Sequence, residues 1–143
     1  MSGLLGSFRH QIDDKGRISL PASFRRDAPD QPFVLVQAHA DALTLYPSAT
    51  WAEVEGRLRD LLRLQPGARP YVLGITANAV EVAPDKQGRI LIPQRLLTAA
   101  GLRDSALLVG AIDRVEVWSP ERFDETISRH SADYDRFTSQ VFG

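Results

Sequence analysis

Short apolar or alternating runs recur along the chain and predict short β-strands. Alternation of apolar and polar residues over about four to eight positions is typical of a strand with one buried face. Such runs occupy residues 8–12, 18–20, 33–37 and 42–46 in the first half and residues 80–83, 90–92, 106–109 and 115–118 in the second. Each half is therefore expected to hold four short strands.

Two prolines mark the places where a strand gives way to a helix. Pro21 and Pro93 each follow a predicted strand, and proline suits the first turn of a helix because its missing N–H group would have no partner there. Gly101 lies where a glycine commonly ends a helix. We therefore expect helices over residues 21–26 and 93–100.

A longer helix is expected near the end of each half. In the first half, Ser48 can cap the helix, and helical spacing predicts an inner face made of Trp51, Val54, Leu58, Leu61 and Leu62. In the second half the helix begins at Ser119 and Pro120. Its expected inner face consists of Phe123, Ile127 and Tyr134.

The two halves align with one another. A single offset of 72 positions places residues 13–21 on residues 85–93 without a gap. The same offset carries residues 43–46 onto residues 115–118 and Trp51 onto the aromatic residue at position 123. Several matches in one constant register indicate a tandem duplication.

The duplication divides the chain into two small modules. We place the first at residues 5–64, a linker at residues 65–76 and the second at residues 77–137. A module of this size with four short strands buries little apolar surface alone. The two copies are therefore expected to interleave their strands around one core. The linker is expected to be a poor helix because it contains Gly67, Pro70 and Gly74.

Composition limits the available chemistry. The chain has no cysteine, which excludes disulfides, thiolate metal sites and cysteine nucleophiles and fits a cytoplasmic protein. Its three histidines lack metal-ligand spacing, and no apolar run is long enough to cross a membrane. We therefore expect no cofactor, no metal, no membrane partner and no small-molecule substrate.

Charge is distributed unevenly, although the net charge is only −1. Residues 1–28 hold five Lys or Arg residues against three Asp, and residues 85–103 hold four against one. Residues 104–143 hold eight carboxylates against four arginines. These two mildly basic segments each contain one copy of a motif, D-x-x-G-R, and they are a weak electrostatic sign of nucleic-acid binding.

That motif, D-x-x-G-R, occurs once in each half. Asp13 and Asp85 can accept hydrogen bonds from backbone N–H groups just ahead of them. The glycines that follow, Gly16 and Gly88, can take the positive φ that closes a tight turn. We expect each motif to form the tip of a hairpin between the two strands that flank it.

The cations of the motif are candidates for DNA contact. Arg17 can bond two acceptors on a guanine edge, and Lys15 supplies a point charge to a phosphate. The alternative is structural, because Arg17 and Arg89 can pair with the nearby aspartates and simply fix the turns. The expected DNA-binding residues are Lys15, Gly16, Arg17, Arg9, Lys86 and Arg89. Ordinary exposed helix positions are expected for Arg25, Arg26 and Arg95.

These segments resemble the MraZ family of bacterial transcription factors. The resemblance is carried by D-K-G-R-I-S-L-P, by D-x-x-G-R-I-L-I-P, and by the later segments L-T-L-Y-P and V-E-V-W-S. It extends from about Leu5 to about Phe137. It implies an α+β fold, mostly β, in which two tandem modules of the AbrB/SpoVT type interleave in one swapped-hairpin, barrel-like domain with flanking helices.

The resemblance also implies a function. MraZ proteins bind direct repeats in double-stranded DNA, usually repress the division and cell-wall gene cluster, and assemble into homo-oligomeric rings. A cytoplasmic, nucleoid-associated regulator is therefore expected. The linker departs from the family, since relatives often carry an arginine where this chain has Leu73, four residues after Arg69. This departure puts in question the part of the linker in DNA binding and assembly.

Two other kinds of function fit the sequence less well. An enzyme would need a nucleophile paired with a base or a phosphate-cradling loop, and the sequence shows neither. A module that holds a protein partner, as AbrB-like antitoxins do, is the second alternative. Burial of Lys15 and Arg17 in a subunit contact would favour that alternative.

Overall fold

The computed structural model describes residues 3–25 and 31–143, so position 26 of the first predicted helix lies outside the described residues. In chain order the strands are β1 (Ser7–Gln11), β2 (Arg17–Ser19), β3 (Phe33–His39), β4 (Ala42–Pro47), β5 (Val80–Val82), β6 (Arg89–Leu91), β7 (Ser105–Gly110) and β8 (Val115–Trp118). The helices are α1 (Ala22–Arg25), α2 (Ser48–Leu64), α3 (Arg69–Asn78), α4 (Gln94–Ala99), α5 (Pro120–Arg129) and α6 (Tyr134–Phe142). The predicted α+β class and the eight strands are confirmed.

The two copies exchange strands within one antiparallel sheet. Its order is β1-β7-β8-β4-β3-β5, so β1 of the first copy pairs with β7 of the second, and β5 of the second pairs with β3 of the first. The order is symmetric about the central β8–β4 pair, because β1 corresponds to β5, β7 to β3 and β8 to β4. The predicted interleaving is therefore confirmed.

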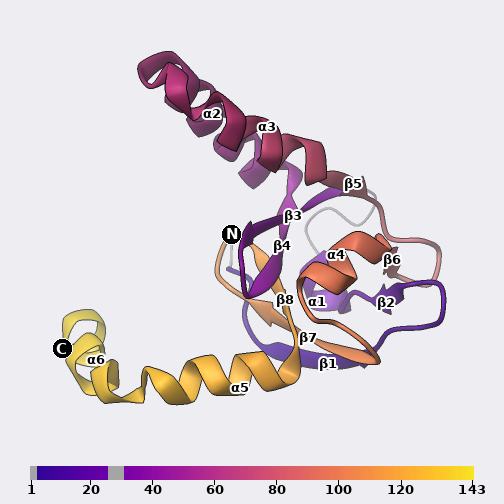
Figure 1. The fold of residues 1–143 in the computed structure, drawn as a ribbon. Helices are drawn as coiled ribbons and strands as arrows, with labels where there is room; N and C mark the ends of the chain where they lie inside the picture. Colours follow the sequence, from indigo (N-terminus) through magenta and orange to yellow (C-terminus); the bar gives the residue numbers. More distant parts are fainter. Residues whose placement is uncertain (1–2, 26–30) are drawn as a thin grey trace.

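The predicted hairpins are wrong in their pairing. Strand β1 does not pair with β2. Instead β2 pairs with β6 of the other copy in a separate two-stranded ribbon, with Ile18 opposite Ile90. The physical reason is the one that predicts interleaving: a copy with four short strands gains more buried surface by exchanging strands than by closing on itself. Figure 1 shows the ribbon beside the larger sheet.

The core lies where this ribbon meets one face of the larger sheet. The large, fully buried side chains of this core come from both copies and from both sheets. They are Ile18, Leu20, Leu35, Leu43, Leu45, Ile90, Ile92, Leu108, Val115 and Val117. Because neither copy supplies a complete core, the two form one folding unit.

The short helices follow the strands of the ribbon, as the prolines predict. Helix α4 ends at Ala99, and Gly101, just beyond it, has a φ of 68°. The N–H of Leu102 donates to the carbonyl of Leu97 at 2.9 Å. A residue with positive φ at this place is a common helix ending that favours glycine. The predicted role of Gly101 is therefore confirmed.

The linker is helical, which corrects the expectation for this segment. A short 3₁₀ turn at Pro66–Ala68 leads into α3, which contains Pro70 and Gly74. Pro70 falls in the first turn of α3, where its missing N–H costs no hydrogen bond. Gly74 has open space around it and only weakens the helix, at a cost of about 1 kcal/mol relative to alanine. Helices α2 and α3 form one projecting arm (Figure 1).

The helix α2 is capped differently from the prediction. The hydroxyl of Ser48 donates to the carbonyl of Pro32 at 2.7 Å and makes no capping bond. The predicted inner face of α2 is half-buried. It contacts the neighbouring sheet, and it contacts α3 around Tyr71 and Ile75.

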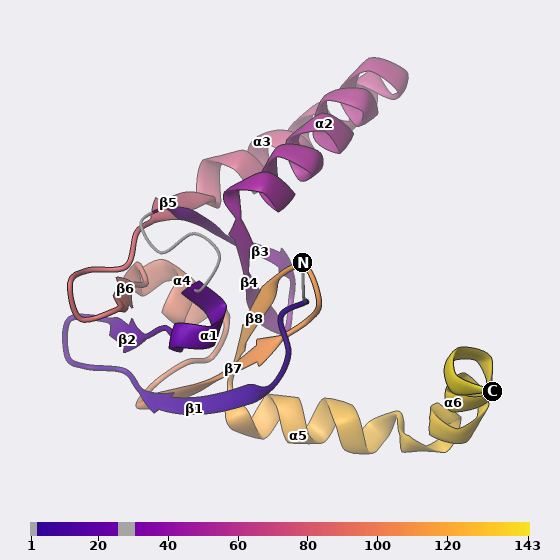
Figure 2. The same cartoon turned by 180° about the vertical axis from the view of Figure 1, so that it is seen from behind.

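The second long helix is capped as predicted but ends early. Ser119 accepts a hydrogen bond from the N–H of Arg122 at 3.3 Å. Helix α5 ends at Arg129 and α6 follows after a 3₁₀ turn. Ile127 and Tyr134 are 57% and 72% exposed, so their predicted place on an inner face is wrong within the single subunit. Figures 1 and 2 show α5 and α6 as a second arm.

Candidate nucleic-acid interface

The first D-x-x-G-R turn is held by its aspartate. One carboxylate oxygen of Asp13, Oδ1, accepts from the backbone N–H groups of Lys15 at 3.0 Å and of Arg17 at 2.8 Å. The other, Oδ2, accepts from Nε of Arg17 at 2.7 Å. The N–H of Gly16 donates to the carbonyl of Asp13 at 3.0 Å. The turn is therefore rigid, and the guanidinium of Arg17 has a fixed direction.

The second turn repeats this geometry bond for bond. Oδ1 of Asp85 accepts from the N–H groups of Gln87 at 2.8 Å and Arg89 at 3.0 Å, and Oδ2 accepts from Nε of Arg89 at 3.1 Å. The N–H of Gly88 donates to the carbonyl of Asp85 at 2.9 Å. Gly16 and Gly88 have φ values of 89° and 78°, as the sequence predicts.

The hydrogen bonds keep both aspartates ionised. The backbone N–H of Arg17 lowers the pKa of Asp13 below its ordinary value, and the backbone N–H of Arg89 does the same for the pKa of Asp85. Desolvation opposes these shifts without cancelling them. Asp13 and Asp85 thus act as turn formers, and the pairing of each arginine with its aspartate, which the sequence leaves open, is present.

Each turn is also bound to the strand of the other copy. The N–H of Leu20 donates to the carbonyl of Gly88 at 2.8 Å, and the N–H of Ile92 donates to the carbonyl of Gly16 at 2.9 Å. Both loops lie at the same end of the molecule, the end away from the two helical arms (Figures 1 and 2). The strand exchange therefore brings together two turns that are distant in sequence.

The cations of the turns remain accessible to solvent. Lys15 and Lys86 are exposed. The side chains of Arg17 and Arg89 are 32% and 29% exposed. Since Nε of each arginine binds the aspartate, the end of the guanidinium is the part available to a ligand. Two lysines and two arginines thus face outward from the two turns.

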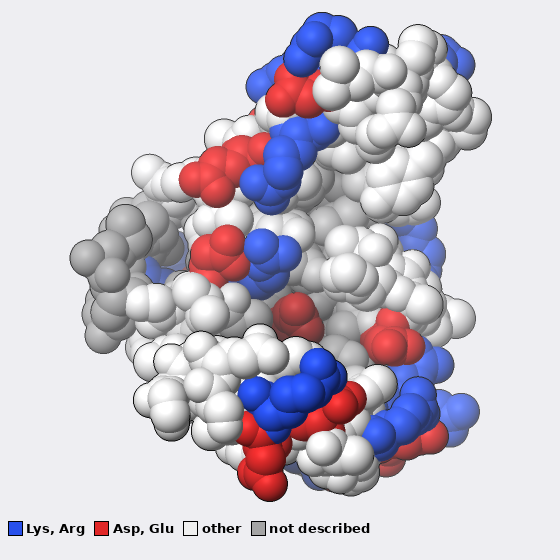
Figure 3. Space-filling model, turned by 90° about the vertical axis from the view of Figure 1, so that its left-hand side faces the viewer, with Lys and Arg blue, Asp and Glu red and all other residues white. Residues whose placement is uncertain are grey.

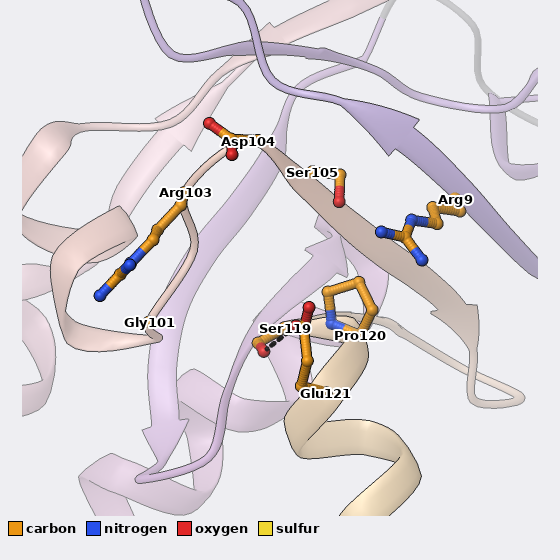
Figure 4. A pocket seen from close by; sticks show the side chains of 8 residues that line it. All are labelled: Arg9, Gly101, Arg103, Asp104, Ser105, Ser119, Pro120 and Glu121. Carbon is orange, nitrogen blue, oxygen red and sulfur yellow. Dashed lines mark hydrogen bonds between the residues drawn. The ribbon is translucent and has the colours of Figure 1, made fainter.

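Arg9 lies apart from the turns. It is an exposed residue of the edge strand β1, paired with Leu107 in β7. Figure 4 shows its guanidinium pointing into the pocket at the start of α5, toward Pro120 and Glu121. A hydrogen bond from its own backbone N–H is the main cause that lowers the pKa of the Glu121 carboxyl; the hydroxyl of Ser119 lowers it further, and Arg9 adds a small electrostatic contribution. The structure therefore does not bring Arg9 together with the motif residues.

Arg25, predicted to be an ordinary exposed helix residue, lies at the second turn. It is half-buried, and its guanidinium packs so closely on Gly88 that a Cβ atom there would lie 2.8 Å from Nη2. The local sequence carries no sign of this contact, because Arg25 and Gly88 belong to different copies.

The opposite face of the molecule has a different electrostatic character. Seen from the side of the two arms, Lys and Arg side chains are interspersed with Asp and Glu (Figure 3). Interspersed charges of both signs produce no extended positive field. This face is therefore a poor candidate for contact with a nucleic-acid backbone.

Residues 3–25 and 31–143 hold no sign of a metal site or a membrane span. No group of three or more His, Asp or Glu residues in that part of the chain could hold a metal ion. None of its helices has the length and apolar character needed to cross a membrane.

The C-terminal arm carries the largest group of exposed apolar side chains. Tyr134, Phe137, Val141 and Phe142 are between 51% and 83% exposed. An apolar cavity of about 570 Å³ lies elsewhere on the subunit, and its apolar walls include Leu4, Phe24, Phe33, Pro47 and Ile112. Clustered exposed apolar side chains mark a surface that contacts another molecule.

Comparison with known proteins identifies relatives along nearly the whole chain. Residues 4–69 and 75–141 each match the family described as "MraZ protein, putative antitoxin-like". A protein of Desulforamulus reducens named transcriptional regulator MraZ is 36% identical, over 96% of this chain and 96% of the relative. Proteins of the same name from Pediococcus pentosaceus and Thermomicrobium roseum are 38% and 42% identical, over 92% and 83% of this chain and 91% and 83% of the relatives.

Proposed function

Because the chain belongs to the MraZ family, we propose that it is a transcriptional regulator that binds double-stranded DNA through its two D-x-x-G-R turns. The observation that carries this proposal is the duplicated turn itself. Two rigid loops built by the same hydrogen bonds lie at one end of the molecule and present exposed cations.

The chemistry of the turns fits DNA. Lys15 and Lys86 are exposed point charges that suit phosphate oxygens. Arg17 and Arg89 have their direction fixed by the aspartates, and a preorganised guanidinium can bond two acceptors on a guanine edge. The lysines are therefore assigned to affinity and the arginines to sequence preference.

Assembly supplies the affinity that one subunit lacks. A subunit with a net charge of −1 and two small turns holds DNA weakly, whereas linked subunits raise the effective concentration of each turn. The apolar C-terminal arm of one subunit is proposed to dock into the apolar cavity of the next. Such a head-to-tail contact closes into a ring when its rotation permits. A ring of this kind presents its turns to direct repeats.

The genes proposed as targets are those of the bacterial division and cell-wall cluster, with repression as the usual outcome. This assignment rests on membership of the family. A protein with this function is expected on the nucleoid in the cytoplasm, with DNA and further copies of itself as its proposed partners.

The proposal is tested by titrating the assembled protein into a labelled duplex from upstream of its own gene. Fluorescence anisotropy is followed at several salt concentrations, with a scrambled duplex alongside. If two subunits each neutralise about two phosphates, the plot of log affinity against log salt has a slope of about −3.6. Tight binding to the native duplex alone is the expected result.

The matched variants remove two charges each. Lys15→Gln combined with Lys86→Gln changes exposed side chains of the turns and reduces the magnitude of the slope by about 0.9 for each phosphate that is no longer neutralised. The control combines Arg63→Gln with Arg129→Gln, two exposed helix residues that form surface ion pairs, and binds as the parent protein does. Equal, feeble binding to both duplexes with a slope near zero contradicts the proposal and favours a module that holds a protein partner.

A further inference from the structure

The two turns are equal in their hydrogen bonds but not in the side chains behind them. A Cβ atom on Gly16 would lie 2.8 Å from the carbonyl oxygen of Ile92 and 3.5 Å from Cδ1 of Leu97. A Cβ atom on Gly88 would instead lie 2.8 Å from Nη2 of Arg25. Arg25 and Leu97 are equivalent positions at the offset of 72. The same place is thus filled by a leucine at the first turn and by an arginine at the second.

Arg25 is fixed in this place by the strand exchange. Its Nε donates to the carbonyl of Leu20 at 3.0 Å, and the N–H of Leu20 donates to the carbonyl of Gly88 at 2.8 Å. The guanidinium of Arg25 is therefore anchored on the carbonyl of Leu20 and lies against Gly88 of the second turn. The absence of a side chain at Gly88 leaves the room that the guanidinium occupies.

The charges within the two turns also differ, and this difference too makes the second turn more positive than the first. The first turn contains two cations and two carboxylates, Asp13 and Asp14. The second turn contains two cations, Lys86 and Arg89, and a single carboxylate. Arg25 adds a third cation to the second turn. Phosphate, which carries a negative charge, is therefore attracted more strongly to the second turn than to the first.

We propose that Arg25 and Lys86, beside Arg89, form a composite phosphate site at the second turn, built from both copies, and that this turn is the stronger of the two DNA contacts. The inference rests on the proposed function and names the part of the interface that dominates it. It also gives the subunit a polarity. Two equal turns related by a two-fold axis suit an inverted repeat, whereas unequal turns distinguish the two directions of a duplex.

The test compares two exposed lysines at the two turns, Lys15→Gln and Lys86→Gln. Neither side chain makes a hydrogen bond with a described residue, so both variants are expected to fold. With two subunits on the duplex, Lys86→Gln reduces the magnitude of the salt slope by about 1.8, from about 0.9 per subunit. Lys15→Gln reduces it by less.

A second pair of variants examines the arginine. Arg25→Gln removes the cation behind Gly88, and Arg95→Gln removes an exposed arginine from the equivalent helix of the other copy as the matched control. Thermal unfolding and light scattering verify that each variant folds and assembles. Because Arg25 and Lys86 belong to one phosphate site, Arg25→Gln is expected to reduce the same contribution to the slope, by up to about 1.8, while Arg95→Gln retains the slope of the parent protein.

The outcomes separate this inference from the function on which it rests. If the parent protein fails to prefer its native duplex, the proposed function itself is wrong. If the parent protein binds as proposed but Lys15→Gln weakens binding as much as Lys86→Gln or more, the second turn is not dominant. A folded Arg25→Gln variant that retains the parent slope likewise overturns the composite site.

Discussion

Replacing Gly16 by alanine is expected to destabilise the protein by about 2–4 kcal/mol. The backbone of Gly16 has a φ of 89°, a left-handed conformation that costs a residue with a Cβ about 1–2 kcal/mol. The new methyl group would lie 2.8 Å from the carbonyl oxygen of Ile92, a backbone atom that cannot rotate away. A shift of this carbonyl oxygen also strains the hydrogen bond from the N–H of Ile92 to the carbonyl of Gly16. Such a bond is worth about 1 kcal/mol.

Two other glycines provide matched comparisons. Gly88→Ala carries the same φ penalty, at 78°, but its methyl group meets a side chain, the guanidinium of Arg25, which can move aside more readily than a backbone atom, so a loss of about 1–2 kcal/mol is expected. Gly56 lies inside α2, and no atom lies within 4 Å of the place that a methyl group would take there. Alanine at this position is expected to stabilise the protein by about 0.5–1 kcal/mol.

Urea denaturation, followed by circular dichroism and tryptophan fluorescence, measures the series. All variants are compared at one protein concentration, because assembly contributes to apparent stability. The expected order of stability is Gly56→Ala, parent, Gly88→Ala and Gly16→Ala. Equal effects at Gly16 and Gly88 would refute the clash with Ile92, and a Gly16→Ala variant as stable as the parent would refute the whole explanation.

Three further measurements address the core, a helix cap and a carboxylate. Leu108→Ala removes a fully buried side chain of β7 and is expected to cost about 2–5 kcal/mol in urea denaturation. Ser119→Ala removes the cap that accepts from Arg122 and is expected to cost about 1 kcal/mol, whereas Ser48→Ala leaves capping of α2 unchanged. The carboxyl of Asp13 is expected to titrate with a pKa below 3.8 when followed by NMR. Because its pKa is lower in the folded state, its contribution to stability is present above pH 3.8 and disappears as the pH falls through the folded pKa; a midpoint at or above 3.8 would contradict this.

The sequence predicts the elements of this fold better than their partners. Alternation of apolar residues is a local signal, and it locates all eight strands to within a few residues. The choice of partner depends on contacts between residues far apart in the chain, such as Phe8 with Leu108. A turn between two apolar runs favours a hairpin, which is why the sequence predicts that the strands flanking each motif pair with one another. The shared core outweighs that preference.

In the candidate interface, too, the sequence predicts local features but not contacts between residues far apart in the chain. The roles of Asp13 and Gly16 follow from residue types within five positions of one another, and both are found in the structure. The position of Arg25 depends on the exchange that carries α1 to the turn of the other copy. The position of Arg9 depends on where β1 enters the sheet. Neither relation is present in the local sequence pattern.

The exchange of strands explains why two copies in one chain differ from a pair of identical subunits. Each turn accepts a hydrogen bond from a backbone N–H of the other copy, so an isolated module lacks one hydrogen bond of its turn. A symmetric dimer of identical modules would place the same residue behind both turns. Joining the copies in one chain removes that constraint, since Arg25 and Leu97 can differ while the hydrogen bonds around both turns stay the same. The single chain can therefore concentrate positive charge on one turn without altering the geometry of the other.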